Sequence, residues 1–190
     1  MASCELSVRE RIENMAAKAR KYAARSLRSD DCLGAAMLVF GLSRDLGLPR
    51  CIMQAGTAFF PRFAEGVRVS DETQTHFGYE WKLDKTSLSL VMKLYLPEMH
   101  CWCAYPSLGL IVDVSVGWQV AQATKNGMDI LNPSLPKWIV ADADEIERMR
   151  MRYNADFMAC SLADALACHL RGVADPLCSW IATASSMIGD

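Results

Sequence analysis

The sequence lacks a long apolar run, a dense basic cluster and any internal repeat. No window of about 18 uncharged apolar residues occurs, so we expect no membrane span. The start, Met1–Glu5, already contains a charged residue and is not followed by the apolar core of a secretory signal peptide. We therefore expect a cytoplasmic protein, although export by a dedicated secretion machine would need no such signal. The 20 basic residues stand against 22 acidic ones, and a nucleic-acid-binding module would usually carry a basic excess.

Hydrophobic residues are plentiful, at 52% of the 190 positions. With only 22% charged residues, the chain can bury enough apolar surface to offset its conformational entropy, which excludes intrinsic disorder. The length fits one domain spanning residues 1–190, and no proline-rich or low-complexity linker divides it.

Eight cysteines are present, but their spacing fits no common zinc pattern. The one close pair, Cys101 and Cys103, is separated by a single residue, one fewer than in a zinc knuckle. In a chain of this size without a signal peptide, reduced thiols are expected rather than disulfides. We therefore expect no metal and no cofactor. The cysteines are at positions 4, 32, 51, 101, 103, 160, 168 and 178.

The hydrophobic pattern places helices first, then strands, then helices, which is typical of an α+β fold. Ser7 and Glu10 form a capping-box signature at the start of the first helix, and Gly47 with Pro49 ends the second. The predicted helices are 5–27, 32–45, 142–152, 161–170 and 176–187, and the predicted strands are 50–57, 79–83, 100–105 and 110–116. Residues 61–77 and 132–136 are expected to be loops, 88–96 fits either a helix or a strand, and 117–141 gives only a weak pattern.

Cys32 is the cysteine best placed for chemistry, because a helix start stabilises a thiolate. A nucleophilic thiol needs a base, and the chain has only three histidines. His100 begins a strand, and Asp113 lies thirteen positions later in an apolar strand beyond the turn Pro106–Gly109, so the two can be cross-strand neighbours. The alternatives are a packed, unreactive thiol and a buried Asp113 bonded to backbone N–H groups. His169, among Ala and Leu, is expected to be structural or solvent-facing.

These residues resemble the transglutaminase-like superfamily of cysteine enzymes, whose core is papain-like. The resemblance covers about residues 30–116 and rests on two blocks in the family's order. The first is Cys32 at a helix start, the helix end Leu46–Pro49 and a strand closing on Gly56; the second is the strand start His100–Trp102 followed by Asp113. It implies a helix bearing the nucleophile packed on a small antiparallel sheet. The helical extensions at 5–27 and 142–188 are predicted by the hydrophobic pattern and not by the resemblance.

The resemblance also implies the role of each residue. Cys32 matches the nucleophile, His100 the general base and acid, and Asp113 the residue that orients His100. Ala104 stands where the family usually has an acid, so no branch is identified. The implied activity is a thiol hydrolase, a peptidase or deamidase acting on an amide of a peptide or protein; the alternatives are an amine acyl transferase and a non-catalytic binding module.

Stabilising the tetrahedral intermediate requires two hydrogen-bond donors near the thiol. The backbone N–H of Cys32 is one candidate, and the side chain of Gln54 is a candidate for the second. Trp102, Trp81 and Tyr79 are candidates to line the substrate cleft, with Trp81 and Tyr79 also open as donors.

Overall fold

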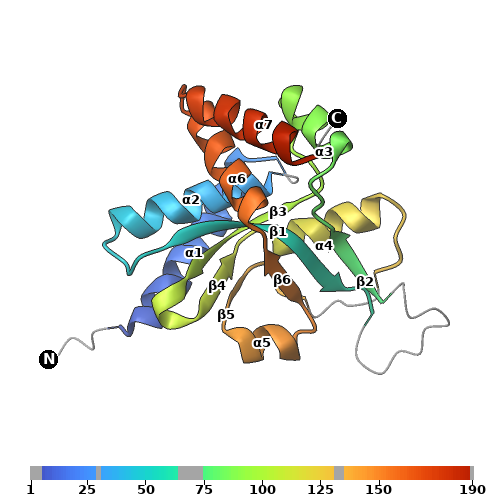
Figure 1. Cartoon of the computed structure of the whole chain (residues 1–190). Coiled ribbons are helices and arrows are strands. Elements are labelled where there is room, and N and C mark those ends of the chain that lie inside the picture. Colours follow the sequence, from blue (N-terminus) through green and yellow to red (C-terminus); the bar gives the residue numbers. More distant parts are fainter. Residues whose placement is uncertain (1–5, 29–30, 64–74, 131–134, 189–190) are drawn as a thin grey trace, which may run out of the picture.

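The computed structural model describes residues 6–28, 31–63, 75–130 and 135–188. These residues form an α+β fold with seven α-helices and one open antiparallel sheet (Figure 1). The helices are α1 (Val8–Ser26), α2 (Cys32–Asp45), α3 (Lys85–Met92), α4 (Val116–Lys125), α5 (Ala143–Arg148), α6 (Phe157–Leu170) and α7 (Asp175–Ile188). The strands are β1 (Ile52–Pro61), β2 (His76–Tyr79), β3 (His100–Tyr105), β4 (Leu110–Asp113), β5 (Ile139–Ala141) and β6 (Arg152–Ala155).

Strand β1 organises the sheet, whose order is β2-β1-β3-β4-β5, with β6 also paired to β1. The first half of β1 pairs with β3, and its second half pairs with β6 and β2. Gly56 is paired on both edges of β1, since it lies opposite His100 of β3 and also opposite Ala155 of β6. A Cβ atom at Gly56 would lie 2.3 Å from the carbonyl oxygen of Asn154, so the close approach of β6 to β1 needs a glycine.

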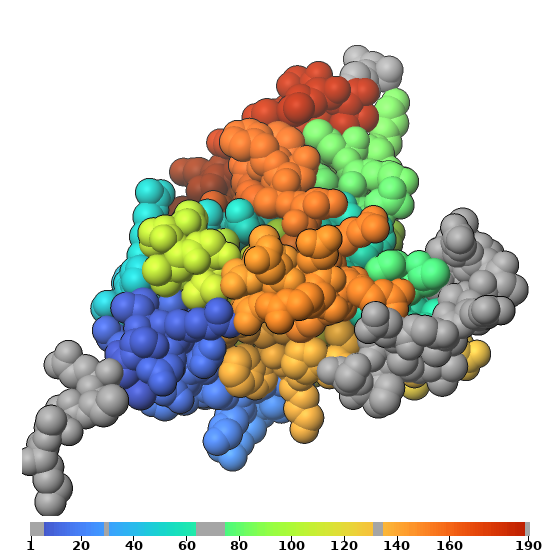
Figure 2. All heavy atoms as spheres, turned by 90° about the horizontal axis from the view of Figure 1, so that it is seen from below, coloured from blue at the N-terminus to red at the C-terminus, as the bar shows by residue number. Residues whose placement is uncertain are grey.

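The helices cover both sides of the sheet. Helix α2 packs on β3, α6 packs on β1, and Figure 1 shows α6, α7 and α3 gathered above the sheet with α5 below it. Figure 2 shows α1 (blue) beside the segment that contains α5 (orange) on the underside. Arg9 of α1 holds Glu145 of α5 there, with a nitrogen–oxygen distance of 2.7 Å.

The strongest local signals predict the elements well. The capping box of Ser7 and Glu10 is present, although α1 begins at Val8 rather than at residue 5, which lies outside the described residues. Helix α2 has the predicted bounds, and Gly47 follows it in the left-handed conformation. The β3–β4 hairpin is also as predicted, except that β4 ends at Asp113 because Val116 already begins α4.

Other predictions are wrong. The predicted strand 79–83 ends at Tyr79, because the Trp81 backbone N–H binds the Thr57 hydroxyl instead of a neighbouring strand. The predicted helix 142–152 stops at Arg148, and β6 follows it, so the extension 142–188 is not entirely helical. Helix α4 and strand β5 were not predicted. In the ambiguous stretch 88–96 the helix continues to Met92. Within the expected loops, 64–74 and 131–134 lie outside the described residues.

Candidate functional site

Cys32 is the first residue of α2, and its side chain is buried at 2% exposure. Asp31 caps the helix by accepting a 2.7 Å hydrogen bond from the backbone N–H of Gly34. The backbone N–H groups of a first helical turn have no carbonyl partner within the helix and carry its positive dipole end. The sequence of α2 therefore places the thiol where a negative charge is stabilised.

His100 and Asp113 meet across the β3–β4 hairpin, as their spacing around the turn predicts. Nε2 of His100 lies 2.7 Å from Oδ2 of Asp113, and both side chains are almost fully buried. The hairpin register, with Tyr105 opposite Leu110, brings the start of β3 beside the end of β4. Local strand pairing alone thus assembles a buried imidazole–carboxylate pair.

Asp113 accepts three further hydrogen bonds. The backbone N–H and the hydroxyl of Ser115 donate to Oδ1 at 2.8 and 2.7 Å, and the Tyr153 hydroxyl donates to Oδ2 at 2.9 Å. The expected alternative, a backbone hydrogen bond to Asp113, is therefore present together with the histidine contact. Burial alone would raise the pKa of Asp113, but the His100 charge and these donors outweigh it and lower that pKa.

The Cys32 thiol interacts with the same imidazole, and each group shifts the pKa of the other. Nδ1 of His100 has no hydrogen-bond partner within the described chain, so it is open to the thiol. A hydrogen bond from the Cys101 thiol and the contact with His100 outweigh burial and lower the pKa of Cys32 to about 5. Burial lowers the pKa of His100, but Asp113 and then Cys32 outweigh it and raise that pKa to about 10. A thiolate–imidazolium pair is therefore favoured at neutral pH.

Aromatic rings fix the orientation of the imidazole. Tyr79 stacks on His100 at 5.4 Å between ring centroids, and Trp102 lies nearly parallel to it at 6.2 Å. Phe60 packs edge-on at 5.6 Å. The hydroxyl of Tyr79 donates to Oε1 of the buried Gln119, so the stacking ring is itself held in place. The histidine can turn little without displacing one of these neighbours.

Gln54 binds Trp102, which differs from the role of second oxyanion donor that the sequence suggested. Its Oε1 accepts a 2.9 Å hydrogen bond from Nε1 of Trp102, the residue opposite it on β3. Gln54 is also not among the residues that line the cleft together with Cys32. Gln54 is therefore no longer our candidate for the second donor.

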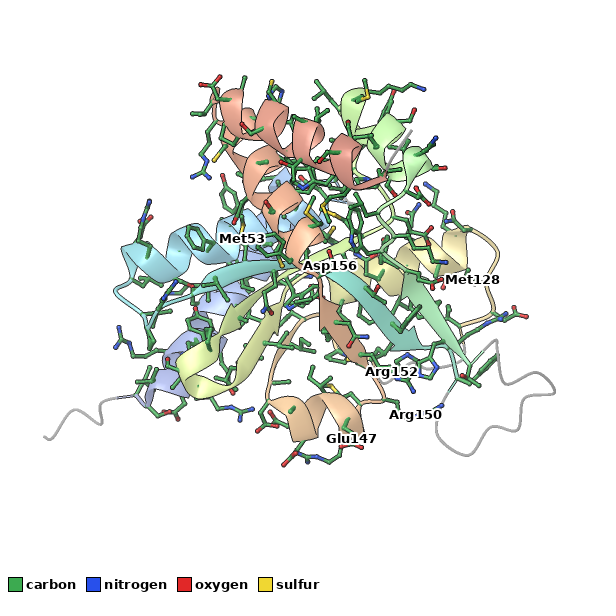
Figure 3. All side chains as sticks on the ribbon, in the orientation of Figure 1. Met53, Met128, Glu147, Arg150, Arg152 and Asp156 are labelled. Atoms are coloured by element: carbon green, nitrogen blue, oxygen red, sulfur yellow. The ribbon has the colours of Figure 1, made fainter. Side chains whose placement is uncertain are left out.

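Two predicted cleft residues are also placed elsewhere. Trp102 is 1% exposed and packs against His100 instead of lining a cleft. Trp81 is also buried, and its Nε1 donates to Asp156 Oδ1 at 2.9 Å, where β6 passes into α6 (Figure 3). The Trp81 N–H is therefore already used. The backbone N–H of Cys32 remains the best placed donor for an oxyanion, with the N–H of Leu33 next to it at the helix start.

A cleft of about 620 Å³ opens beside Cys32. Tyr79 lines it, as predicted, together with the connection between α3 and β3 and the end of α6. His169 of α6 lines it as well, whereas the sequence suggested a structural or solvent-facing role. No local pattern around His169 could have revealed this, because the position depends on how α6 packs over β1.

No metal site or membrane span is evident in the described part of the chain. Among residues 6–28, 31–63, 75–130 and 135–188, no group of three or more His, Cys, Asp or Glu side chains could hold a metal ion. The same residues include no helix that is both long and apolar enough to cross a bilayer. The seven cysteines within these ranges are free thiols.

Comparison with protein-family models, with curated proteins and with solved structures finds no match to this chain. The resemblance to transglutaminase-like enzymes therefore rests on the residues themselves.

Proposed function

We propose that the protein is a cysteine-dependent hydrolase of the transglutaminase-like type, which cleaves an amide bond of a peptide or protein. One observation carries the proposal: the buried His100 ring lies 2.7 Å from the Asp113 carboxylate, and the Cys32 thiol interacts with the same ring. A thiol, an imidazole and a carboxylate in this order activate a nucleophile in unrelated folds.

In the first half of the proposed reaction, the Cys32 thiolate bonds to the amide carbonyl carbon. The carbonyl oxygen becomes negative and is stabilised by the backbone N–H of Cys32 at the helix start. The C–N bond then breaks, and the amine leaves with the proton of the His100 imidazolium. Asp113 holds the ring and stabilises its charged form before this transfer.

In the second half, water attacks the thioester carbonyl carbon and gives a proton to the neutral His100. The C–S bond breaks, the acid product leaves, and the thiolate–imidazolium pair is restored. An amine in place of water would give acyl transfer by the same route. The described residues provide no feature that favours an amine, so hydrolysis is the activity proposed.

The test compares the wild-type protein with Cys32→Ser on a mixture of peptides, with product masses read by mass spectrometry. We expect new peptide termini, or a gain of about one mass unit for side-chain deamidation, with the wild type only. His100→Gln is the second variant and should lose the same products. Products that persist in both variants would contradict the proposal. If all three proteins lack products and the wild-type thiol is no more reactive than an ordinary one, the non-catalytic alternative holds.

A further inference from the structure

The cleft beside Cys32 is lined mainly by apolar side chains, and several of them are exposed. Leu94 and Tyr95, in the connection between α3 and β3, are 58% and 63% exposed. Leu170, at the end of α6, faces the same cleft and is 66% exposed. Single exposed apolar residues are common, but a group from two separate segments around one cleft marks a binding surface.

Leu94 also has a backbone conformation that is unusual for its residue type. Five helices of the described chain end in the same way, with one residue in the left-handed conformation after the last turn. The N–H of that residue and the N–H of the next residue both donate back to carbonyl groups of the last helical turn. Three of these ends have the glycine that this conformation favours, namely Gly47, Gly127 and Gly172. The two exceptions are Leu94, with φ +61°, and Arg150, with φ +57°.

A left-handed leucine costs free energy that a glycine would avoid. The hydrogen bonds from the N–H of Leu94 to Val91 and from the N–H of Tyr95 to Leu90 would form equally well with glycine at position 94. The leucine side chain gains little burial in return, because it stays more than half exposed. Its position in the wall of the cleft is the one structural advantage that the leucine brings.

We propose that this cleft binds a large apolar side chain on the acyl half of the substrate, such as leucine or phenylalanine next to the amide that is cleaved. The inference rests on the proposed function. Cys32 lines the cleft, so an acyl group bonded to its sulfur extends into it. Arg28, Asp31 and His169 also line the cleft and offer polar groups of both charge signs, which suit a peptide backbone better than a plain hydrocarbon chain.

The test uses two peptidyl acyloxymethyl ketones that differ only in leucine or glycine next to the reactive group. Labelling of Cys32 is followed by intact mass. We expect the leucine compound to react faster, on the order of tenfold to a hundredfold, as for other apolar pockets that discriminate by side-chain size. Equal rates would overturn the proposal, and so would fast labelling by a long-chain acyl ketone without any labelling by the peptides.

The variant Leu94→Gly tests the wall of the cleft without weakening the fold. We expect it to keep or raise the thermal midpoint, because glycine suits the left-handed position, and to reduce the leucine preference severalfold. Arg150→Gly is the matched control: it makes the same backbone change below the sheet, away from α3 and α6 (Figure 3), and should leave the preference unchanged. Leu170→Ser should also reduce the preference. A preference that survives both Leu94→Gly and Leu170→Ser would contradict the assignment.

Two further measurements distinguish this inference from the proposed function. The midpoint of the pH profile of Cys32 alkylation by iodoacetamide reports the pKa of the thiol, independently of access through the cleft. Binding of fluorescent peptides with leucine or glycine to Cys32→Ala, measured by anisotropy, reports the cleft alone. An unreactive thiol would end the proposed function, whereas equal binding of the two peptides would end the cleft assignment.

Discussion

Tyr153 donates a 2.9 Å hydrogen bond to Oδ2 of Asp113, the oxygen that also contacts His100. Burial and then the Asp113 charge raise the pKa of the Tyr153 hydroxyl well above its usual value, so it remains a donor at any working pH. The strand that carries Tyr153 is β6, which pairs with β1 from Gly56 to Phe59. The carboxylate is therefore held from its own strand and from a segment distant in sequence.

Tyr153→Phe should destabilise the protein by about 1.5–3 kcal/mol, the range for a hydrogen bond to a charged group. The aromatic packing of the ring on Trp102 is kept, so the loss comes from the hydroxyl. Urea unfolding at pH 7 measures it. Tyr95→Phe, at an exposed position, is the control and should change little. Equal stability of the two variants would show that the bond to Asp113 contributes nothing.

Cys32 should be alkylated first among the thiols by iodoacetamide at pH 6–7. Its pKa is lowered to about 5, so the thiolate fraction rises through that pH and is nearly complete by pH 7. An ordinary thiol, with a pKa near 8.5, would react faster with each pH step up to about 9. Peptide mapping identifies the labelled residue. Labelling of Cys51 or Cys178 at the same rate would refute the assignment of Cys32.

Cys101→Ala should raise the pKa of Cys32, because the Cys101 thiol supplies the largest favourable contribution to the thiolate. The alkylation profile of Cys32 should move to higher pH. Cys103→Ala removes a thiol from the same strand and the same face and is the matched control. The Cys103 thiol donates to the carbonyl of Ala36 at 3.2 Å. Equal profiles for the two variants would show that Cys101 is not the donor.

Asp113→Asn should keep the fold but lower the pKa of His100, because the charge that holds the imidazolium is removed. The folded-state pKa of His100 is raised, so its contribution to stability is fully present below about pH 6.5 and is lost as pH rises toward 10. In the variant this pH dependence should shrink, and hydrolysis should fall by up to about 10⁴, as in a serine triad. Unchanged alkylation of Cys32 across pH in a folded variant would remove Asp113 from the triad.

Gly56→Ala should destabilise the protein by more than about 1 kcal/mol, because the new methyl group would meet the backbone of Asn154. Gly41→Ala is the control: a methyl group there would have no neighbouring atom within 4 Å, and alanine favours the helix interior. Thermal unfolding of both variants measures the difference in stability. A Gly56→Ala protein as stable as Gly41→Ala would mean that β1 and β6 can move apart at little cost.

The sequence predicted those parts of the site that depend on local structure. Cys32 follows from helix-start signals, and the pairing of His100 with Asp113 follows from counting around a four-residue turn. Gln54 was misplaced because the sequence alone did not show which face of β1 packs against α2. Strand β6 escaped prediction because Arg152–Ala155 has little apolar character, and its pairing with β1 stabilises it. Tyr153 and His169 reach the site through such long-range packing.

The position of β6 also bears on how the chain matures during synthesis. A ribosome makes Cys32, His100 and Asp113 before it makes residues 152–155. Until then, the part of β1 beyond Gly56 has no β6 beside it, and the carboxylate lacks its tyrosine. The nascent chain therefore carries all three chemical groups without the complete network that holds them, and the fully ordered site forms only after a late segment has joined the sheet.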